Sequence, residues 1–540
     1  MARTRLFQRV LDAVSIASES SKRGVSVEQI SEERIQQSIT RREFLQKAVT
    51  MGVVAAIPSS FLRFGNLVAN ASTTPRIAIV GAGLAGLTCA YRLKQAGLIA
   101  QVYEASSRVG GRCWTRRGDF ANGQIAEHGG ELIDQNHTDI LHLSQELGLN
   151  VDDVLNAQPT GTEDFYYVNG ARYSLAQFSN DLQAIWQQIH SDYSNAASTQ
   201  YNNYTQRGWE LDHMSVRGWI NQYVPGGVNS NLGKLLDLTY ENEFGAPSTE
   251  LSSLNLIWIL GALGPGQPRI LGKSNGKYHV HGGNDQIPQI LAQRCPNQIS
   301  TGYELIKIKK NSDSTYTLTF KVGVNTQNVV ADHVVLAMPF SILRESVDFS
   351  EAGFSQLKQT AITQLGMGVN AKLQLQFTER SWYNLGCTGG SFSDTGYQDT
   401  WEVTRAQSGS TGILVEFAGT DVATSLNSGT LNSQAIKFLG QLEPVLPGIT
   451  AKWNGMVTLD YWPGNKFSKG SYSYYKVGQT TLFAGYEGVQ EGNCHFAGEH
   501  TSSLFQGFLN GAVESGQRAA SEITAIVCSQ ASVPSTANAL

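Results

Sequence analysis

The stretch 76–104 constrains what this chain can fold into more than any other. It combines a short apolar run rich in β-branched residues, a glycine turn, a helical pattern and a second strand that ends in an acid. These features are the strand Ile77–Val80, the glycines Gly81, Gly83 and Gly86, a helix over 84–96 closed by Gly97, and a strand over 99–103 followed by Glu104. The glycines permit a tight turn, the helix N-terminus attracts a pyrophosphate, and the acid accepts hydrogen bonds from ribose hydroxyls. The pattern therefore predicts a βαβ unit that binds a dinucleotide.

Length, charge and cysteine usage set further limits. A chain of 540 residues exceeds one hydrophobic core, so we expect two domains. The formal net charge of −5 argues against nucleic acid or an anionic membrane surface as a partner. The 6 cysteines are scattered without a C-x-x-C pair, which indicates neither a disulfide framework nor a zinc site. We therefore expect a globular protein that binds neither metal nor nucleic acid.

The first 71 residues have the features of an export leader. Arg41 and Arg42 precede a mildly apolar run over 48–57, which matches a twin-arginine signal, and the small residues at 69–71 offer a cleavage site. The apolar run is shorter than the roughly 20 residues of a membrane span. An amphipathic helix that happens to contain Arg-Arg is the alternative. The pattern predicts export to the periplasm or the extracellular space, without stable membrane insertion.

Further glycine motifs point to one family. They are R-x-G-G-R over 108–112, A-G-E-x-T over 497–501 and G-A-V-x-S-G over 511–516. Together with the glycine turn and its acid, they resemble the flavin-dependent amine oxidases, the group of monoamine, polyamine and L-amino-acid oxidases. The resemblance covers residues 76–527 and implies FAD rather than NAD as the cofactor. Monoamine oxidases that attach FAD covalently carry a cysteine where this chain has Ser471, so the resemblance implies non-covalent FAD.

The resemblance also implies the architecture. The fold class is α/β, with a Rossmann-like FAD-binding domain assembled from separate chain segments and an α+β substrate domain. The FAD-binding segments are expected at 76–137, 273–345 and 453–527, and the substrate-binding segments at 138–272 and 346–452. Residues 528–540, rich in Ser, Ala and Thr, are expected to form a disordered tail.

Seven residues are predicted to bind the cofactor. They are Gly81, Gly83, Gly86 and Glu104 from the βαβ pattern, and Arg112, Leu305 and Glu499 from the resemblance. Arg112 offers a planar fork to a phosphate, and Leu305 lies on a strand whose backbone is expected against the adenine. Taken alone, each of these segments has a plainer alternative. The motif over 108–112 could be a glycine-rich surface loop, the strand of Leu305 part of a β-meander packed on a core, and the C-terminal motifs the start of a packed terminal helix.

Three residues are predicted to act in catalysis. The resemblance places Lys372, in a strand over 370–377, where the family keeps a lysine that holds a water against the flavin N5. The alternative is a solvated strand face or an edge guard. Tyr472 and Phe508 match the two rings between which the family holds its amine, and rings of this kind give apolar walls and cation–π attraction. Their alternative is ordinary core packing.

By this resemblance, the α-carbon of an amine gives hydride to flavin N5. The imine then hydrolyses to an aldehyde or a 2-oxo acid with ammonia, and oxygen reoxidises the flavin to give hydrogen peroxide. The partners are thus a small amine or amino acid and molecular oxygen, and a homodimer is one of the oligomeric states left open. The alternatives are a related flavin desaturase acting on C–C bonds and a flavoprotein that binds a ligand without turnover.

The substrate class stays open between a primary amine and a basic L-amino acid. Similar L-amino-acid oxidases place an arginine just after the Glu-x-Gly-Gly segment to grip the α-carboxylate. In this chain the segment begins at Glu127 and continues to Glu131 without an arginine. Either the substrate is a simple amine or polyamine, or an arginine from the substrate domain grips the carboxylate. Glu131 itself has two interpretations, an attractor of a cationic amine or a structural carboxylate bonded to backbone N–H groups.

Overall fold

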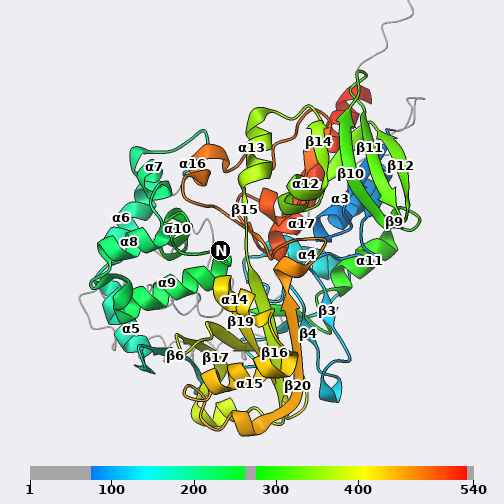
Figure 1. Cartoon of the computed structure of the whole chain (residues 1–540). Helices are drawn as coiled ribbons and strands as arrows, with labels where there is room; N and C mark the ends of the chain where they lie inside the picture. Colours follow the sequence, from blue (N-terminus) through cyan, green and yellow to red (C-terminus); the bar gives the residue numbers. More distant parts are fainter. Residues whose placement is uncertain (1–74, 197, 262–274, 532–540) are drawn as a thin grey trace, which may run out of the picture.

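The computed structural model describes residues 75–531 except 197 and 262–274 (Figure 1). The predicted leader, residues 1–71, lies outside the described residues, and so do residues 532–540 of the predicted tail. The described part of that tail continues the last helix, α17 (Leu509–Ala531), so the expectation of disorder is wrong for residues 528–531. Among the described residues, no helix has the length and apolar character needed to cross a membrane.

The predicted βαβ unit lies in a five-stranded parallel sheet. β1 (Ile77–Val80) is buried along its whole length, as expected for a parallel strand covered on both faces. It pairs with β2 (Ala100–Glu104), to which α3 (Leu84–Gln95) connects it, and with β13 (His333–Leu336). The full order is β22 (Cys494–Phe496), β13, β1, β2 and β9 (Ile299–Thr301). Strands from distant parts of the chain therefore end at the same edge of one sheet.

Helices α3 and α17 lie side by side on this sheet (Figure 1). Gly516 of α17 permits the close approach, because a Cβ there would come within 2.3 Å of the Ala85 carbonyl oxygen in α3. A third helix, α4 (Thr138–Glu146), packs on the same core through Ile140 and Leu143. Its Ile140 N–H donates to Asn510 Oδ1 of α17 at 2.9 Å. The long C-terminal helix thus ties the first glycine segment to the end of the chain.

A four-stranded sheet stands beside the parallel one. Its order is β12 (Asn325–Ala331), β11 (Tyr316–Val322), β10 (Tyr303–Lys310) and β14 (Asp348–Glu351). β10 contains Leu305, so the predicted strand at this residue is present. The register of β10 shifts between Leu305 and Lys307, and Leu305 itself is buried.

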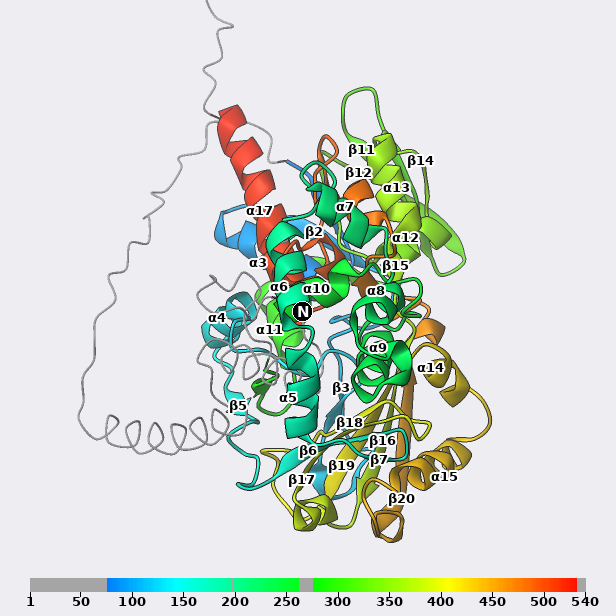
Figure 2. The ribbon, with the colours of Figure 1, turned by 90° about the vertical axis from the view of Figure 1, so that its left-hand side faces the viewer.

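The substrate half is built on a seven-stranded mixed sheet (Figure 2). Its order is β20 (Trp453–Tyr461), β16 (Asn370–Phe377), β19 (Gly412–Gly419), β18 (Asp399–Glu402), β17 (Cys387–Ser393), β6 (Glu163–Val168) and β7 (Ala171–Arg172). An apolar core joins one face of this sheet to α14 (Thr420–Leu426) and α15 (Leu431–Leu442). β16 is flanked by β19 and β20, so it is a central strand and not an edge.

The remaining elements complete the two halves. A helical cluster consists of α5 (Leu175–Gln183), α6 (Trp186–Ala196), α7 (Gln206–Asp212), α8 (Val216–Tyr223), α9 (Asn231–Phe244) and α10 (Leu254–Gly261). The other helices are α11 (Gln286–Arg294), α12 (Phe340–Ser346), α13 (Gln356–Gln364) and α16 (Gln479–Phe483). Short strand pairs are β3 (Thr115–Arg116) with β4 (Ala126–Glu127), β5 (Val151–Asp153) with β8 (Tyr278–Val280), and β15 (Gly366–Met367) with β21 (Ser473–Tyr474).

The expected domain boundaries differ from the observed packing at three places. α4, expected in the substrate domain, packs on the core of the parallel sheet. β14, also expected there, pairs with β10 of the four-stranded sheet. β20, expected with the cofactor segments, pairs along β16 of the seven-stranded sheet. In each case a short element packs in the domain whose apolar face or strand edge it completes. The residue pattern within the element does not specify which domain that is.

Candidate active site

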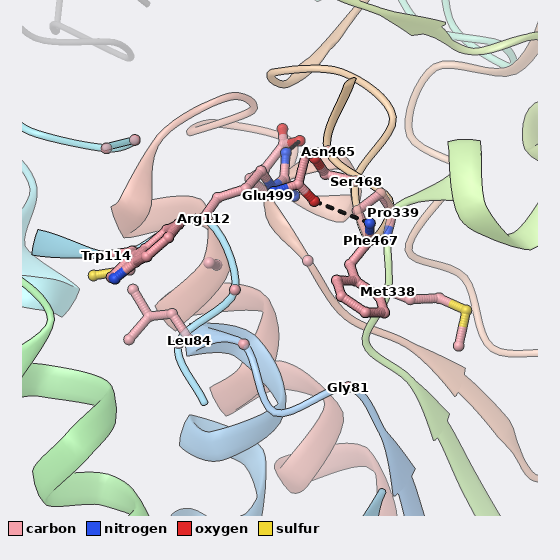
Figure 3. A pocket seen from close by; sticks show the side chains of 18 of the residues that line it. Gly81, Leu84, Arg112, Trp114, Met338, Pro339, Asn465, Phe467, Ser468 and Glu499 are labelled. Atoms are coloured by element: carbon pink, nitrogen blue, oxygen red, sulfur yellow. Dashed lines mark hydrogen bonds and ion pairs between the residues drawn. The ribbon is translucent and has the colours of Figure 1, made fainter. Parts of the chain in front are cut away.

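A cavity of about 920 Å³ extends from the parallel sheet to the seven-stranded sheet (Figure 3). Figure 3 shows Gly81 at the end of β1, with Leu84 and Trp114 on one side of the cavity and Met338 and Phe467 on the other. The predicted site residues that line it are Gly81, Gly83, Glu104, Arg112, Leu305, Lys372, Tyr472, Glu499 and Phe508. Gly86 does not line it and lies behind the turn, where a Cβ would come within 2.0 Å of the Gly81 carbonyl oxygen.

The N-terminus of α3 opens into one end of the cavity. Gly83 is its N-cap residue, no side chain caps it, and the first turn holds no acid. A Cβ on Gly83 would meet nothing within 4 Å, so the space above the free N–H groups is open. Uncapped N–H groups and the positive end of a helix dipole form an anion site. This end of the cavity fits the pyrophosphate of a dinucleotide.

Glu104 fixes the glycine turn. Its carboxylate accepts the Ala82 N–H at 2.7 Å and the Ser106 N–H at 2.8 Å, and the side chain is buried at the cavity wall. A carboxylate has acceptor sites for further donors beyond these two. The carboxylate can therefore still accept hydrogen bonds from a ribose, and this predicted contact stays a prediction.

Glu499 joins three separate segments at the middle of the cavity. It accepts from Arg112 Nη1 at 2.9 Å, from Ser473 N and Oγ at 3.2 and 2.8 Å, and from the Gly507 N–H at 2.7 Å. Burial alone would raise the pKa of Glu499, but the charge of Arg112 and the side-chain hydrogen bonds from Arg112 and Ser473 lower it. Arg112 also donates to the Ser471 carbonyl oxygen at 2.8 Å. The Arg112 guanidinium is therefore already hydrogen-bonded to protein groups through Nη1 before any phosphate binds.

Lys372 lies in the other half of the cavity as one member of a buried ion pair. Its Nζ donates to Glu131 Oε2 at 2.7 Å and to the carbonyl oxygens of Glu127 and Gly129, each at 3.1 Å. The residue is only 3% exposed in a central strand, so the solvated-face and edge alternatives are wrong. Its predicted catalytic role stays a prediction.

The partners of Glu131 are side chains, which neither interpretation from the sequence included. Those interpretations are an attractor of a cationic amine and a carboxylate bonded to backbone N–H groups. Besides Lys372, Glu131 accepts from Trp401 Nε1 at 2.9 Å, and no backbone N–H bonds it within the described residues. Burial alone would raise the pKa of Glu131, whereas the charge and hydrogen bond of Lys372 and the hydrogen bond of Trp401 lower it. The carboxylate is therefore held in its ionised form.

Aromatic rings also line the cavity. Tyr472 and Phe508 were predicted, and Trp401 of β18 and Phe417 of β19 join them. The Tyr472 hydroxyl donates to the Glu243 carbonyl oxygen at 2.6 Å, and the Phe508 ring meets His137 edge-on at 4.7 Å. Sequence reasoning missed Trp401 and Phe417, because a single aromatic residue in a strand carries no local signal of a cavity.

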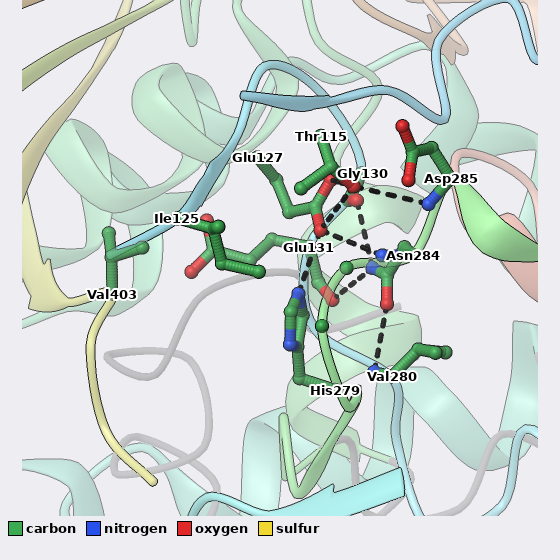
Figure 4. A network of polar contacts seen from close by, with 12 residues as sticks. Thr115, Ile125, Glu127, Gly130, Glu131, His279, Val280, Asn284, Asp285 and Val403 are labelled. Carbon is green, nitrogen blue, oxygen red and sulfur yellow. Dashed lines mark hydrogen bonds and ion pairs between the residues drawn. The ribbon is translucent and has the colours of Figure 1, made fainter. Parts of the chain in front are cut away.

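A polar network behind the cavity holds the 126–131 segment in place (Figure 4). The fully buried Glu127 accepts from Thr115 Oγ1 at 2.9 Å, from the Asn284 N–H at 2.9 Å, and from His279 Nε2 at 2.8 Å. Burial alone would lower the pKa of His279, but the hydrogen bond to Glu127 and the Glu127 charge outweigh it and raise that pKa. The network anchors the segment that provides all three acceptors of Lys372.

The cavity offers no reactive thiol for covalent attachment within the described residues. Ser471 is buried with its hydroxyl bonded to Gly368 and Asn370. The cysteine that lines the cavity is Cys113, whose Sγ donates to the Asn284 carbonyl oxygen at 3.3 Å. Burial, with the nearby charges of Glu127 and Asp285, raises the pKa of that thiol well above its usual range. Non-covalent binding agrees with this arrangement.

The described residues hold no group of three or more potential metal ligands.

Comparisons with known proteins decide the family. The family model described as flavin containing amine oxidoreductase matches residues 84–524. The chain belongs to this amine oxidoreductase family. A Bacillus subtilis (strain 168) protein named "Putative L-amino-acid oxidase YobN" is 26% identical over 478 residues, covering 84% of this chain and 96% of that protein. Amine oxidase [flavin-containing] B of Bos taurus is 25% identical over 471 residues, covering 83% of this chain and 85% of that protein.

Solved structures agree with the fold. Cyclohexylamine oxidase from Brevibacterium oxydans IH-35A superimposes with a TM-score of 0.73 at 21% identity, covering 84% of this chain and 99% of that one. The predicted fold class, a Rossmann-like FAD-binding domain with a substrate domain, is confirmed. The amine oxidoreductase uses FAD, and the open N-terminus of α3 at one end of an elongated cavity fits that cofactor.

A pair of glycine substitutions separates cofactor binding from folding. Gly83→Ala places a methyl group in open space at the N-terminus of α3, so we expect FAD affinity to fall about tenfold or more with little change in apoprotein stability. Gly86→Ala overlaps the Gly81 carbonyl oxygen and is expected to destabilise the apoprotein by roughly 1–3 kcal/mol. Flavin titration and urea unfolding of both apoproteins test this. Wild-type FAD affinity in Gly83→Ala would contradict the assignment.

The Glu127–His279 pair predicts a pH dependence of stability. Because the pKa of His279 is raised above its ordinary value of 6.5, its stabilisation is fully present below pH 6.5. It is lost as the pH rises through the higher pKa of the folded state. His279→Asn should remove this part of the pH dependence when free energies of unfolding are compared at about pH 5.5 and about pH 9. The exposed His281→Asn serves as the control, and equal slopes in the wild type and His279→Asn would refute the prediction.

Proposed function

We propose that this chain is an FAD-dependent oxidase of primary amines that carry no α-carboxylate, with oxygen as the acceptor and hydrogen peroxide as a product. The supporting observation is that the cations lining the cavity in the described residues are already engaged. Arg112 pairs with Glu499, Lys372 with Glu131 and Lys466 with Glu304, while Arg108 donates to the carbonyl oxygens of Val109 and Gly111. A buried substrate carboxylate is best bound by the two parallel N–H groups of an arginine. The contacts just described already engage the cations that could provide such a bond.

The aromatic half of the cavity suits an amine. When bound, FAD supplies the two-electron acceptor for the hydrogen on the carbon next to nitrogen. The rings of Tyr472, Phe508, Trp401 and Phe417 exclude water and favour the uncharged form of the amine. The hydrogen bond from Tyr472 to Glu243 and the contact of Phe508 with His137 fix two of these rings in orientation.

An L-amino acid is the second candidate. It is supported by the name of the Bacillus subtilis relative, which covers 84% of this chain. The two arginines of the described lining, Arg108 and Arg112, already donate to protein oxygens, so this candidate ranks below a simple amine.

Matched substrate pairs distinguish the two candidates. Each pair joins an amine to the amino acid that carries one additional carboxylate: phenethylamine with phenylalanine, cadaverine with lysine, and agmatine with arginine. Under anaerobic conditions we expect at least one amine to bleach the oxidised flavin band about 100-fold faster than its partner, because an unpaired buried carboxylate is costly. Bleaching by the amino acids alone would refute the amine assignment. Bleaching by neither class would favour the desaturase or the non-catalytic flavoprotein.

We also propose that residues 1–71 direct export by the twin-arginine route. The supporting observation is the Arg41-Arg42 pair before a short apolar run. Replacing both arginines with lysine keeps the charge and should retain the folded, flavin-loaded protein in the cytoplasm. Cell fractionation followed by peroxide assay tests this, and unchanged export of the double variant would refute it.

A further inference from the structure

The three donors of Lys372 are all used by its own chain. A protonated lysine has three N–H donors and no acceptor. Glu131 Oε2 takes one at 2.7 Å, and the carbonyl oxygens of Glu127 and Gly129 take the others at 3.1 Å. These acceptors belong to one five-residue stretch. The ammonium is thus fully satisfied by protein groups and lies with its ion-pair partner at the cavity wall.

The partner carboxylate is equally fixed. Trp401 Nε1 holds Glu131 Oε1 at 2.9 Å while Lys372 holds Oε2, and the Lys372 Nζ lies 5.6 Å from the centre of the Trp401 ring. Both side chains of the ion pair are at most 6% exposed. A buried pair at this distance adds no net charge to the wall, whereas either member alone would be an uncompensated charge in a poorly solvated site.

The position of the pair places it near the redox-active end of the cofactor. Glu104 and the N-terminus of α3 fit the ribose and the pyrophosphate at one end of the cavity. With the adenine expected against the strand of Leu305, the ring system of bound FAD would lie in the half of the cavity whose wall includes Lys372, Glu131 and Trp401. A net charge on that wall shifts the equilibrium between the oxidised and the reduced, more negatively charged ring.

We propose that Glu131 is a positioning residue that holds Lys372 against the 127–131 segment and cancels its charge, and thereby sets the reduction potential of the bound FAD. Lys372 therefore acts through a closed ion pair and not as a free cation. The proposal requires bound FAD, which the family provides, and is independent of the substrate proposed above. An experiment can therefore refute the role of Glu131 without refuting the amine substrate, and the reverse.

The test measures the midpoint potential of bound FAD near pH 6.5 against reference dyes in three variants. Glu131→Gln leaves an unpaired ammonium and should favour the reduced flavin about tenfold or more, which is a shift of about 30 mV to more positive potential for a two-electron couple. Adding Lys372→Met should return the potential to the wild-type value, because the double variant again has no net charge at this position. Trp401→Phe removes a hydrogen bond from Glu131 but no charge, so its potential should stay at the wild-type value.

Each result decides the matter. A wild-type potential in Glu131→Gln, or a shift that persists in the double variant, overturns the proposal. If Glu131→Gln fails to hold FAD, the double variant carries the test, because the proposal requires it to hold FAD once the unpaired ammonium is gone. Loss of FAD from the double variant as well would assign Glu131 a merely structural role and overturn the proposal.

Discussion

The structure depends on one buried carboxylate, Glu499, at the carboxyl end of β22. It accepts hydrogen bonds from Arg112, from Ser473 and from the Gly507 N–H at the entry to α17. Arg112 lies more than 350 residues before Ser473 and Gly507 in the chain, and it does not pair in a common sheet with either segment. Because a buried carboxylate is costly unless its acceptors are filled, the three segments must converge on it. Convergence of these segments is what creates the cavity between the sheets.

The parallel sheet explains why such a convergence point exists. β1, β13 and β22 are neighbours in space, although most of the substrate half is inserted between them in sequence. Their carboxyl ends open at one edge, where the glycine turn after β1 and Gly498 after β22 both line the cavity. Ligands of open parallel sheets bind at such an edge. The insertions then place the aromatic wall and Lys372 opposite that edge, so the two halves complete one site.

The sequence predicts the local elements of this fold well and their partners poorly. The strand, turn and helix over 77–95 follow from apolar patterns and turn residues, which act locally. The places of β20, α4 and β14 depend on which strand edge or apolar face they complete, and the pattern within a short segment does not specify this. Trp401 and Glu131 show the same limit in the site, since each acquires its role from a residue more than 200 positions away.

Lys372, Gln374 and Gln376 show how tertiary structure reverses a local expectation. Alternating polar residues in a strand usually indicate a solvated face, yet every residue of β16 is buried. Gln374 donates to the Glu127 carbonyl oxygen and Gln376 to that of Ala121, each at 3.0 Å. The 121–131 segment has little sheet of its own, so its buried carbonyl groups need side-chain donors. The polar stripe of a substrate-domain strand therefore satisfies the backbone of a cofactor-domain loop. Lys372 is the member of that stripe that carries a charge, and for that reason a carboxylate had to lie beside it.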